Sequence, residues 1–171
     1  RLLSGADGAV SLADFLDPQE LSALYERFVL AYFRRHHPHL RPGAPWVSGG
    51  IEDVPVFLPG LHTDIVLTGP ERTLIIDTKC YGRILGSRYD KSILSPANRN
   101  QIYSYVMHEA SDPRQVGREV AGMLLYAQTA VDPPIRETWT ETGHRFHVRT
   151  LDLDRDFTEI AAQLDDVAAQ I

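Results

Sequence analysis

Two short apolar runs joined by a turn constrain this chain more than any other feature. Residues 62–67 and 73–79 are each typical of a β-strand, and residues 69–72 between them contain the glycine and proline of a turn. If the turn is centred on the middle of that segment, the strands pair antiparallel and Asp64 lies directly opposite Asp77. The sequence therefore predicts a hairpin that carries two facing carboxylates.

These carboxylates would repel each other, because opposed side chains in a sheet have Cβ atoms roughly 5 Å apart. A fold keeps such a pair when something neutralises it, most often a divalent cation bound by carboxylate oxygens. Lys79 follows Asp77 by two residues, so both lie on the same face of the strand. Two acids and a lysine in apolar strands indicate a metal-dependent phosphodiesterase. The alternative is a chance Asp-x-Lys triplet at a solvated strand end.

Composition sets the general class of protein. With 171 residues, 43% of them hydrophobic, the chain has the length of one domain with a real core. No apolar run approaches the ~20 residues that cross a bilayer, and Cys80 is a single cysteine, so we expect a reduced, cytoplasmic protein without a membrane segment. The chain begins with Arg1, and we expect it to be the C-terminal part of a longer polypeptide.

The charge is unevenly distributed. The net charge is −6, which argues against broad affinity for nucleic acid. However, residues 79–101 hold five basic residues and one acid, whereas residues 150–171 hold six acids and one arginine. A basic stretch next to paired acids suits a phosphate polymer that meets a bound metal, although a solvated loop is the alternative. The predicted DNA-binding residues are Arg83, Arg88, Lys91, Arg99 and Tyr105.

The remaining pattern predicts an α/β protein. Asp17 and Pro18 begin a helix that runs to about residue 37, with apolar residues at helical spacing. The other predicted elements are a short strand near Trp46, the hairpin, a helix over 95–110, strands over 120–128 and 145–151, and a helix over 157–171. Residues 81–94 and 131–142 are predicted to be loops. This order indicates a mixed sheet flanked by helices.

Two helices offer further site residues. Glu26 has apolar angular neighbours on the first helix, and glutamates are seldom buried unless they are paired or bind a ligand. Gln101 and Tyr105 lie four residues apart on one face of the second helix, where an amide could orient a catalytic lysine or contact a phosphate. The alternatives are a salt bridge from Glu26 to a nearby arginine and an ordinary polar helix edge.

The order of these candidate residues along the chain resembles the motifs of the PD-(D/E)xK nuclease superfamily. The residues are Glu26, Asp64, the Asp-Thr-Lys of residues 77–79, and Gln101 with Tyr105. More narrowly, the chain is similar to the McrC-type nuclease domain of McrBC modification-dependent restriction systems. The likeness covers approximately residues 20–128. It implies one domain over residues 1–171, an α/β fold with a PD-(D/E)xK restriction-endonuclease-like core. Thr63 stands where the superfamily's name has proline, and Asp77 takes a place that is often held by glutamate; neither variation removes a ligand.

The resemblance implies a Mg²⁺-dependent endonuclease that acts on double-stranded DNA, with Mn²⁺ able to substitute. Asp64 and Asp77 would bind the metal together with the Thr78 main-chain carbonyl, and Glu26 would bind it directly or through water. Lys79 would orient or deprotonate the attacking water or stabilise the transition state, and Gln101 would position Lys79. The implied partner is an AAA+ GTPase motor of the McrB type, in a 5-methylcytosine-dependent restriction system.

Two other functions are compatible with parts of the pattern. One is a catalytically silent nuclease-fold module that binds DNA or bridges subunits, but such a module has no need to keep facing acids. The other is a glycosidase, which also uses two carboxylates but gives Lys79 no role.

Overall fold

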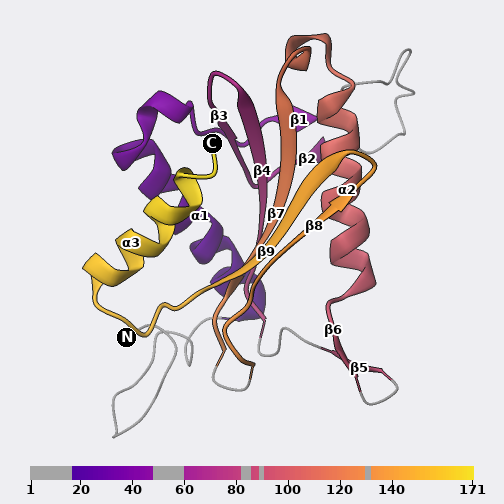
Figure 1. Cartoon of the computed structure of the whole chain (residues 1–171). Helices are drawn as coiled ribbons and strands as arrows, with labels where there is room; N and C mark the ends of the chain where they lie inside the picture. Colours follow the sequence, from indigo (N-terminus) through magenta and orange to yellow (C-terminus); the bar gives the residue numbers. More distant parts are fainter. Residues whose placement is uncertain (1–16, 48–59, 82–85, 89–90, 130–131) are drawn as a thin grey trace, which may run out of the picture.

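The computed structural model describes residues 17–47, 60–81, 86–88, 91–129 and 132–171. Its centre is a five-stranded mixed sheet (Figure 1). The three inner strands run parallel, and each outer strand is antiparallel to its neighbour. In spatial order the strands are β3 (Ile65–Thr68), β4 (Arg72–Lys79), β7 (Glu119–Ala127), β9 (His144–Leu151) and β8 (Arg136–Glu141). The predicted α/β class with a mixed central sheet is confirmed.

Helices cover both faces of this sheet. Helices α1 (Pro18–His36) and α3 (Phe157–Ala168) lie on one face, and α2 (Pro96–Ala110) lies on the other (Figure 1). Each face has its own apolar core. Alternate residues of β4 point into different cores: Leu74 and Ile76 pack with α1 and α3, whereas Ile75 packs with α2. The face that a β4 side chain occupies therefore decides which helix it meets.

The first helix begins where the sequence predicts. Asp17 accepts hydrogen bonds from the main-chain N–H groups of Gln19 and Glu20, and Glu20 accepts one from Asp17 N, which completes a capping box. At its other end, the Tyr32 hydroxyl and His37 Nε2 each lie 2.7 Å from Asp165 Oδ1 on α3. The two helices on this face are thus fixed to each other by polar contacts as well as by apolar packing.

The predicted hairpin register is confirmed. Ile65 pairs with Ile76 and Thr68 pairs with Thr73, which centres the turn between residues 70 and 71. The first run is not one continuous strand, because β2 (Leu61–His62) ends before Asp64 and pairs with β1 (Trp46–Val47). Asp64 therefore lies in a bend between two short strands, one residue before β3.

Two predicted loops contain strands. Within residues 81–94, β5 (Gly86–Arg88) and β6 (Lys91–Ile93) form a two-stranded hairpin that stands away from the sheet (Figure 1). Within residues 131–142, β8 forms the outer edge of the main sheet by pairing with β9. Both loop predictions are wrong, since these strands are stabilised by pairing with partners rather than by an apolar pattern of their own. The short 3₁₀ helices η2 (Pro38–Leu40) and η3 (Pro113–Gln115) complete the described elements.

In the described part of the chain, none of the helices combines the length and the apolar character that crossing a bilayer requires.

Candidate active site

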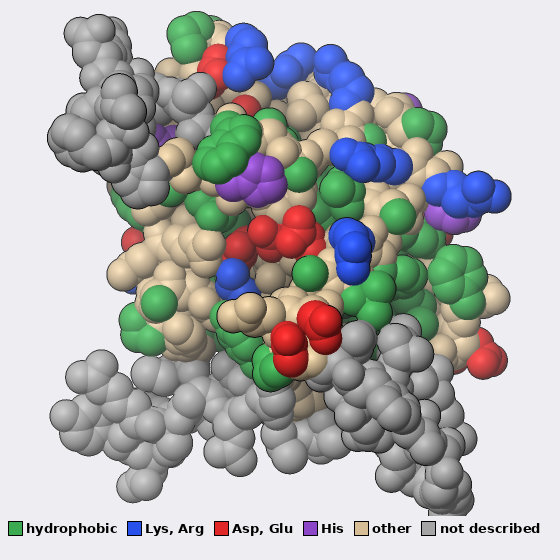
Figure 2. Space-filling view, turned by 180° about the vertical axis from the view of Figure 1, so that it is seen from behind, with side chains coloured by type: hydrophobic (Ala, Val, Ile, Leu, Met, Phe, Trp, Pro, Cys, Tyr) green, Lys and Arg blue, Asp and Glu red, His purple; other side chains and the backbone are tan. Residues whose placement is uncertain are grey.

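The predicted acids, the lysine and the glutamine line one cleft. It lies where the end of β4 meets the bend before β3, between the first half of α1 and the start of α2. On the face of the molecule seen in Figure 2, acidic side chains gather near the centre. The cleft is lined by Pro18, Gln19, Ser22, Ala23, Glu26, Asp64, Asp77, Thr78, Lys79, Cys80, Tyr81 and Gln101.

Asp77 is buried in this cleft without full satisfaction of its carboxylate. Its side chain is 1% exposed, and its Oδ2 lies 2.7 Å from Lys79 Nζ. Neither carboxylate oxygen has a hydrogen bond of good geometry with the described residues, so the ion pair with Lys79 is the contact that compensates the charge. Burial raises the pKa of Asp77 to about 6, Lys79 opposes that rise, and Asp64 and Glu26 add to it. An incompletely satisfied buried carboxylate is costly for a fold and is suited to binding a cation.

Asp64 approaches the same place from the bend before β3. Its Oδ2 accepts hydrogen bonds from Thr78 N at 2.7 Å and from Thr78 Oγ1 at 2.8 Å. These bonds hold the carboxylate against the end of β4, next to Asp77. Its Oδ1 accepts no hydrogen bond from the described residues. One oxygen of Asp64 thus fixes the side chain while the other stays free to bind a ligand.

A short chain of hydrogen bonds holds Lys79. Its ammonium donates to Gln101 Oε1 at 3.0 Å, and Gln101 Nε2 donates to the Tyr105 hydroxyl at 2.8 Å. The contact between Gln101 and Lys79 that the sequence predicted is present. Burial is the largest single influence on the pKa of Lys79 and lowers it, but Asp77, together with Tyr81 and Asp64, raises the pKa, and the net direction is upward. Lys79 is therefore held in place as a cation.

Glu26 enters the cleft from α1. It is partly buried, and burial together with the neighbouring Asp64 carboxylate raises its pKa. No salt bridge joins it to an arginine within the described residues, so the alternative considered for this residue is not what the structure shows. Cys80 directly follows β4 and is buried in the core that α1 covers.

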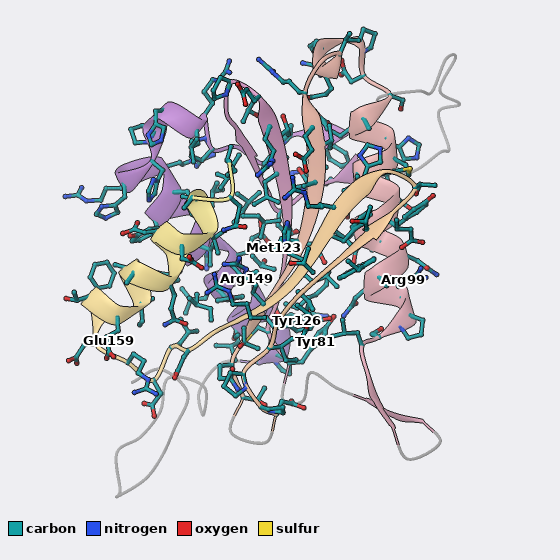
Figure 3. All side chains as sticks on the ribbon, viewed as in Figure 1. Tyr81, Arg99, Met123, Tyr126, Arg149 and Glu159 are labelled. Atoms are coloured by element: carbon teal, nitrogen blue, oxygen red, sulfur yellow. The ribbon has the colours of Figure 1, made fainter. Side chains whose placement is uncertain are left out.

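Three residues that the sequence did not single out form a hydrogen-bonded group beside the cleft. Tyr81 lines the cleft, and its hydroxyl lies 3.4 Å from Asn98 Oδ1. Asn98 Nδ2 donates to the hydroxyl of the buried Tyr126 at 2.9 Å. Figure 3 shows Tyr81 and Tyr126 close together at this end of the sheet, with ring centroids 6.2 Å apart. No sequence signal marks this group, because its members come from three separate elements.

The residues predicted to bind DNA are placed less favourably for that role than the predicted acids and the lysine are for theirs. Tyr105 is 5% exposed and accepts a hydrogen bond from Gln101, so it supports the lysine from within the core and does not form part of a DNA surface. Arg99 lies on the outer side of α2 (Figure 3), where it forms an ion pair with Glu141 at 2.7 Å. Arg88 and Lys91 belong to the small β5–β6 hairpin, and Arg83 lies outside the described residues.

The donor set fits a divalent cation that keeps water and substrate ligands. No cluster of three or more His, Cys, Asp or Glu side chains is arranged to hold a metal within the described residues. Two carboxylates with free oxygens are nevertheless what Mg²⁺ uses in many sites, where substrate phosphates and water complete its shell. The unsatisfied oxygens of Asp77 and the free Oδ1 of Asp64 are the observations that support this fit.

Comparison with known proteins gives independent information about which proteins this chain is similar to. No family model matches the chain. The chain is 26% identical over 153 residues to the type IV methyl-directed restriction enzyme EcoKMcrBC of Escherichia coli K12. The chain is similar to an McrBC restriction enzyme. This similarity confirms the McrBC resemblance predicted from the motifs.

The McrBC match covers most of this chain but a smaller part of the relative. It includes 87% of this chain and 42% of the length of EcoKMcrBC. The similarity thus reaches well beyond the short motifs that first indicated it. The chain corresponds to less than half of the McrBC protein that it matches.

Proposed function

We propose that this chain is a metal-dependent endodeoxyribonuclease of the PD-(D/E)xK type, which hydrolyses phosphodiester bonds of double-stranded DNA. The observation that carries the proposal is the buried, incompletely satisfied Asp77 carboxylate, in contact with Lys79 and next to Asp64. A silent module would have no need for this costly arrangement.

The proposed metal is Mg²⁺, with Mn²⁺ as a substitute. Asp64 and Asp77 would hold it with the Thr78 main-chain carbonyl, and Glu26 would add a ligand directly or through water. When bound, the cation polarises the scissile phosphate and lowers the pKa of a bound water. With so few carboxylates, we expect weak Mg²⁺ affinity until DNA phosphates are present.

The role of Lys79 follows from its charge. Because the net shift raises its pKa, Lys79 is protonated at neutral pH and is a poor base in this state. We therefore assign it to orienting the attacking water and stabilising the negative charge that develops on the phosphoryl oxygens. Gln101 and Tyr105 keep the ammonium aimed at that position through their hydrogen bonds. Gln101 is thus a positioning residue.

The similarity to EcoKMcrBC supports a role in a restriction system, with this chain as the cleavage part. In this proposal, an AAA+ GTPase of the McrB type binds 5-methylcytosine-containing DNA in the cytoplasm and delivers it to the nuclease. The name of the relative, a methyl-directed restriction enzyme, supports the class of DNA.

Nicking of supercoiled plasmid, measured with Mg²⁺, Mn²⁺ or EDTA in the presence of a McrB-type partner and GTP, tests this function. We expect cutting with either metal and none with EDTA. A protein that binds DNA but never cuts it would be the silent module. Cutting that persists in EDTA would exclude the proposed metal centre.

A further inference from the structure

A second cavity is lined in part by the segment of chain that also carries Asp64. It has a volume of about 520 Å³, and its lining includes Arg41, Trp46, Val66 and Arg118. Val66 follows Asp64 by two residues and packs in the core under α2, so this cavity is on the same face of the sheet as Asp77 and Lys79. The second cavity and the candidate active site therefore lie on one face of the sheet, linked by the short segment from His62 to Val66.

The lining of this cavity is positively charged. It contains Arg41, Arg114 and Arg118 but a single acid, the buried Glu109, which accepts a hydrogen bond from Gln115 Nε2 at 2.6 Å. Arg114 is paired with Asp112 at 2.6 Å. Arg41 and Arg118 have no ion pair with an acid of the described residues. On the face in Figure 2, Lys and Arg side chains lie along the edge above the central acids.

The same cavity has an exposed aromatic wall. Trp46 is 66% exposed, although large aromatic side chains usually bury most of their area. Its ring is braced by His62, with ring centroids 4.9 Å apart, and His62 precedes Asp64 by two residues. A Cβ atom at Gly60 would lie 2.7 Å from the ring, so glycine is required there for this close contact. The exposed indole is thus held by contacts with His62 and Gly60, and it shares the cavity with two arginines that have no ion-pair partner among the described residues.

We propose that this cavity, which we term the arginine–tryptophan cavity, binds the DNA strand that leads into the cleft. In this arrangement Arg41 and Arg118 contact phosphates, and the Trp46 ring packs against the adjoining nucleotide. Guanidinium groups match phosphate geometry, and exposed aromatic rings pack on nucleotides in many DNA-binding grooves. The positive lining disfavours a basic partner segment, and Trp46 packs on His62, which precedes Asp64 by two residues and so links the cavity to a proposed metal ligand. The inference rests on the proposed nuclease function.

The test is a DNA-binding measurement without catalysis. Fluorescence anisotropy of a labelled 30-base-pair duplex is recorded in EDTA over a range of salt concentrations. The variants are Arg41→Gln with Arg118→Gln, and Trp46→Ala. Matched controls are Arg136→Gln with Arg155→Gln, which remove the same charge on β8 and before α3, and Phe157→Ala, whose parent side chain is similarly exposed at 58%.

We expect the Arg41/Arg118 double variant to lose at least about tenfold in affinity and to reduce the slope of log K against log salt by about two, one for each lost phosphate contact. Trp46→Ala should lose about fivefold or more with an unchanged slope. The controls should bind as the parent does. Parent-like binding by both cavity variants, or no binding by the parent at low salt, would overturn the proposal.

The outcomes separate this proposal from the nuclease function. Because binding is measured in EDTA, a parent that binds through the cavity but does not cut would disprove the nuclease alone. If the cavity variants bind DNA normally but lose partner-dependent cutting, the cavity contacts a protein subunit, and our assignment is wrong.

Discussion

At the scale of single residues, the account depends on the cost of burying Asp77. In an unfolded chain an aspartate has a pKa near 4, whereas in this fold it is raised to about 6. Between these values the folded state binds more protons than the unfolded state, so folding stability falls as pH rises through this window. Two pKa units correspond to a loss of about 3 kcal/mol above pH 6.

Replacing Asp77 with Asn should remove this loss. Above pH 6 and without metal, we expect the free energy of unfolding to rise by between zero and about 3 kcal/mol, since loss of the partner of Lys79 offsets part of the gain. At pH 4 the difference should disappear, because Asp77 is then protonated in the parent. Urea unfolding at both pH values measures this. A variant clearly less stable than the parent at pH 8 would contradict the account.

Replacing Lys79 with Ala should abolish cleavage while metal affinity persists, since an ammonium group cannot bind a cation. Isothermal calorimetry with Mn²⁺ at pH 8 compares the variant with the parent. Gln101→Ala, which removes only the support of Lys79, should retain more activity than Lys79→Ala. If Mn²⁺ affinity collapses in Lys79→Ala, the separate roles of acid and lysine are incorrect.

Among single residues, the sequence predicted correctly those site contacts that follow from the regular spacing of residues in strands and helices. Asp64, Asp77 and Lys79 follow from strand alternation and turn position, and the contact of Gln101 with Lys79 followed once a helix was assumed. Arg99 was misjudged because its partner, Glu141, lies on β8, a strand that the pattern did not reveal.

At the scale of elements, the placement of α2 on β7 controls the lysine. A Cβ atom at Gly122 would lie 2.8 Å from both Ile102 and Val106 of α2. Gly122→Ala should therefore push α2 outward, destabilise the fold by about 1–3 kcal/mol and loosen Gln101 from Lys79. We expect cleavage to fall while Mn²⁺ affinity stays near that of the parent.

Gly43→Ala is the control, because the nearest atom to an added Cβ is Pro45 Cδ at 3.9 Å. It should change the unfolding free energy by less than about 0.5 kcal/mol. Thermal unfolding compares the two variants, and plasmid nicking compares Gly122→Ala with the parent. Equal stability of the two variants, together with parental cutting by Gly122→Ala, would show that close packing of α2 does not position the lysine.

The elements themselves were predictable where local signals were strong. The capping box at Asp17 and the apolar run of β7 marked α1 and the central strand correctly. Strand β8 escaped prediction, because five of its six residues are polar and it forms through pairing with β9. Such pairing depends on residues distant in sequence, which local pattern does not record.

At the scale of the whole molecule, charge limits what the chain does alone. Its net charge of −6 disfavours binding to the negatively charged DNA, and the arginine–tryptophan cavity offers few phosphate contacts. A few contacts give weak binding at physiological salt. We therefore expect slow cutting by the isolated chain and a large increase with a motor subunit that holds the DNA nearby, since tethering raises the local concentration.

The most direct measurement combines partner and site in one plasmid assay. Methylated plasmid is incubated with Mg²⁺, GTP and a McrB-type GTPase, together with either the parent chain or Asp77→Asn. The account predicts cutting by the parent when all components are present, little without the GTPase, and none with the folded Asp77→Asn variant. Cutting by Asp77→Asn at the rate of the parent would contradict the proposed catalytic centre.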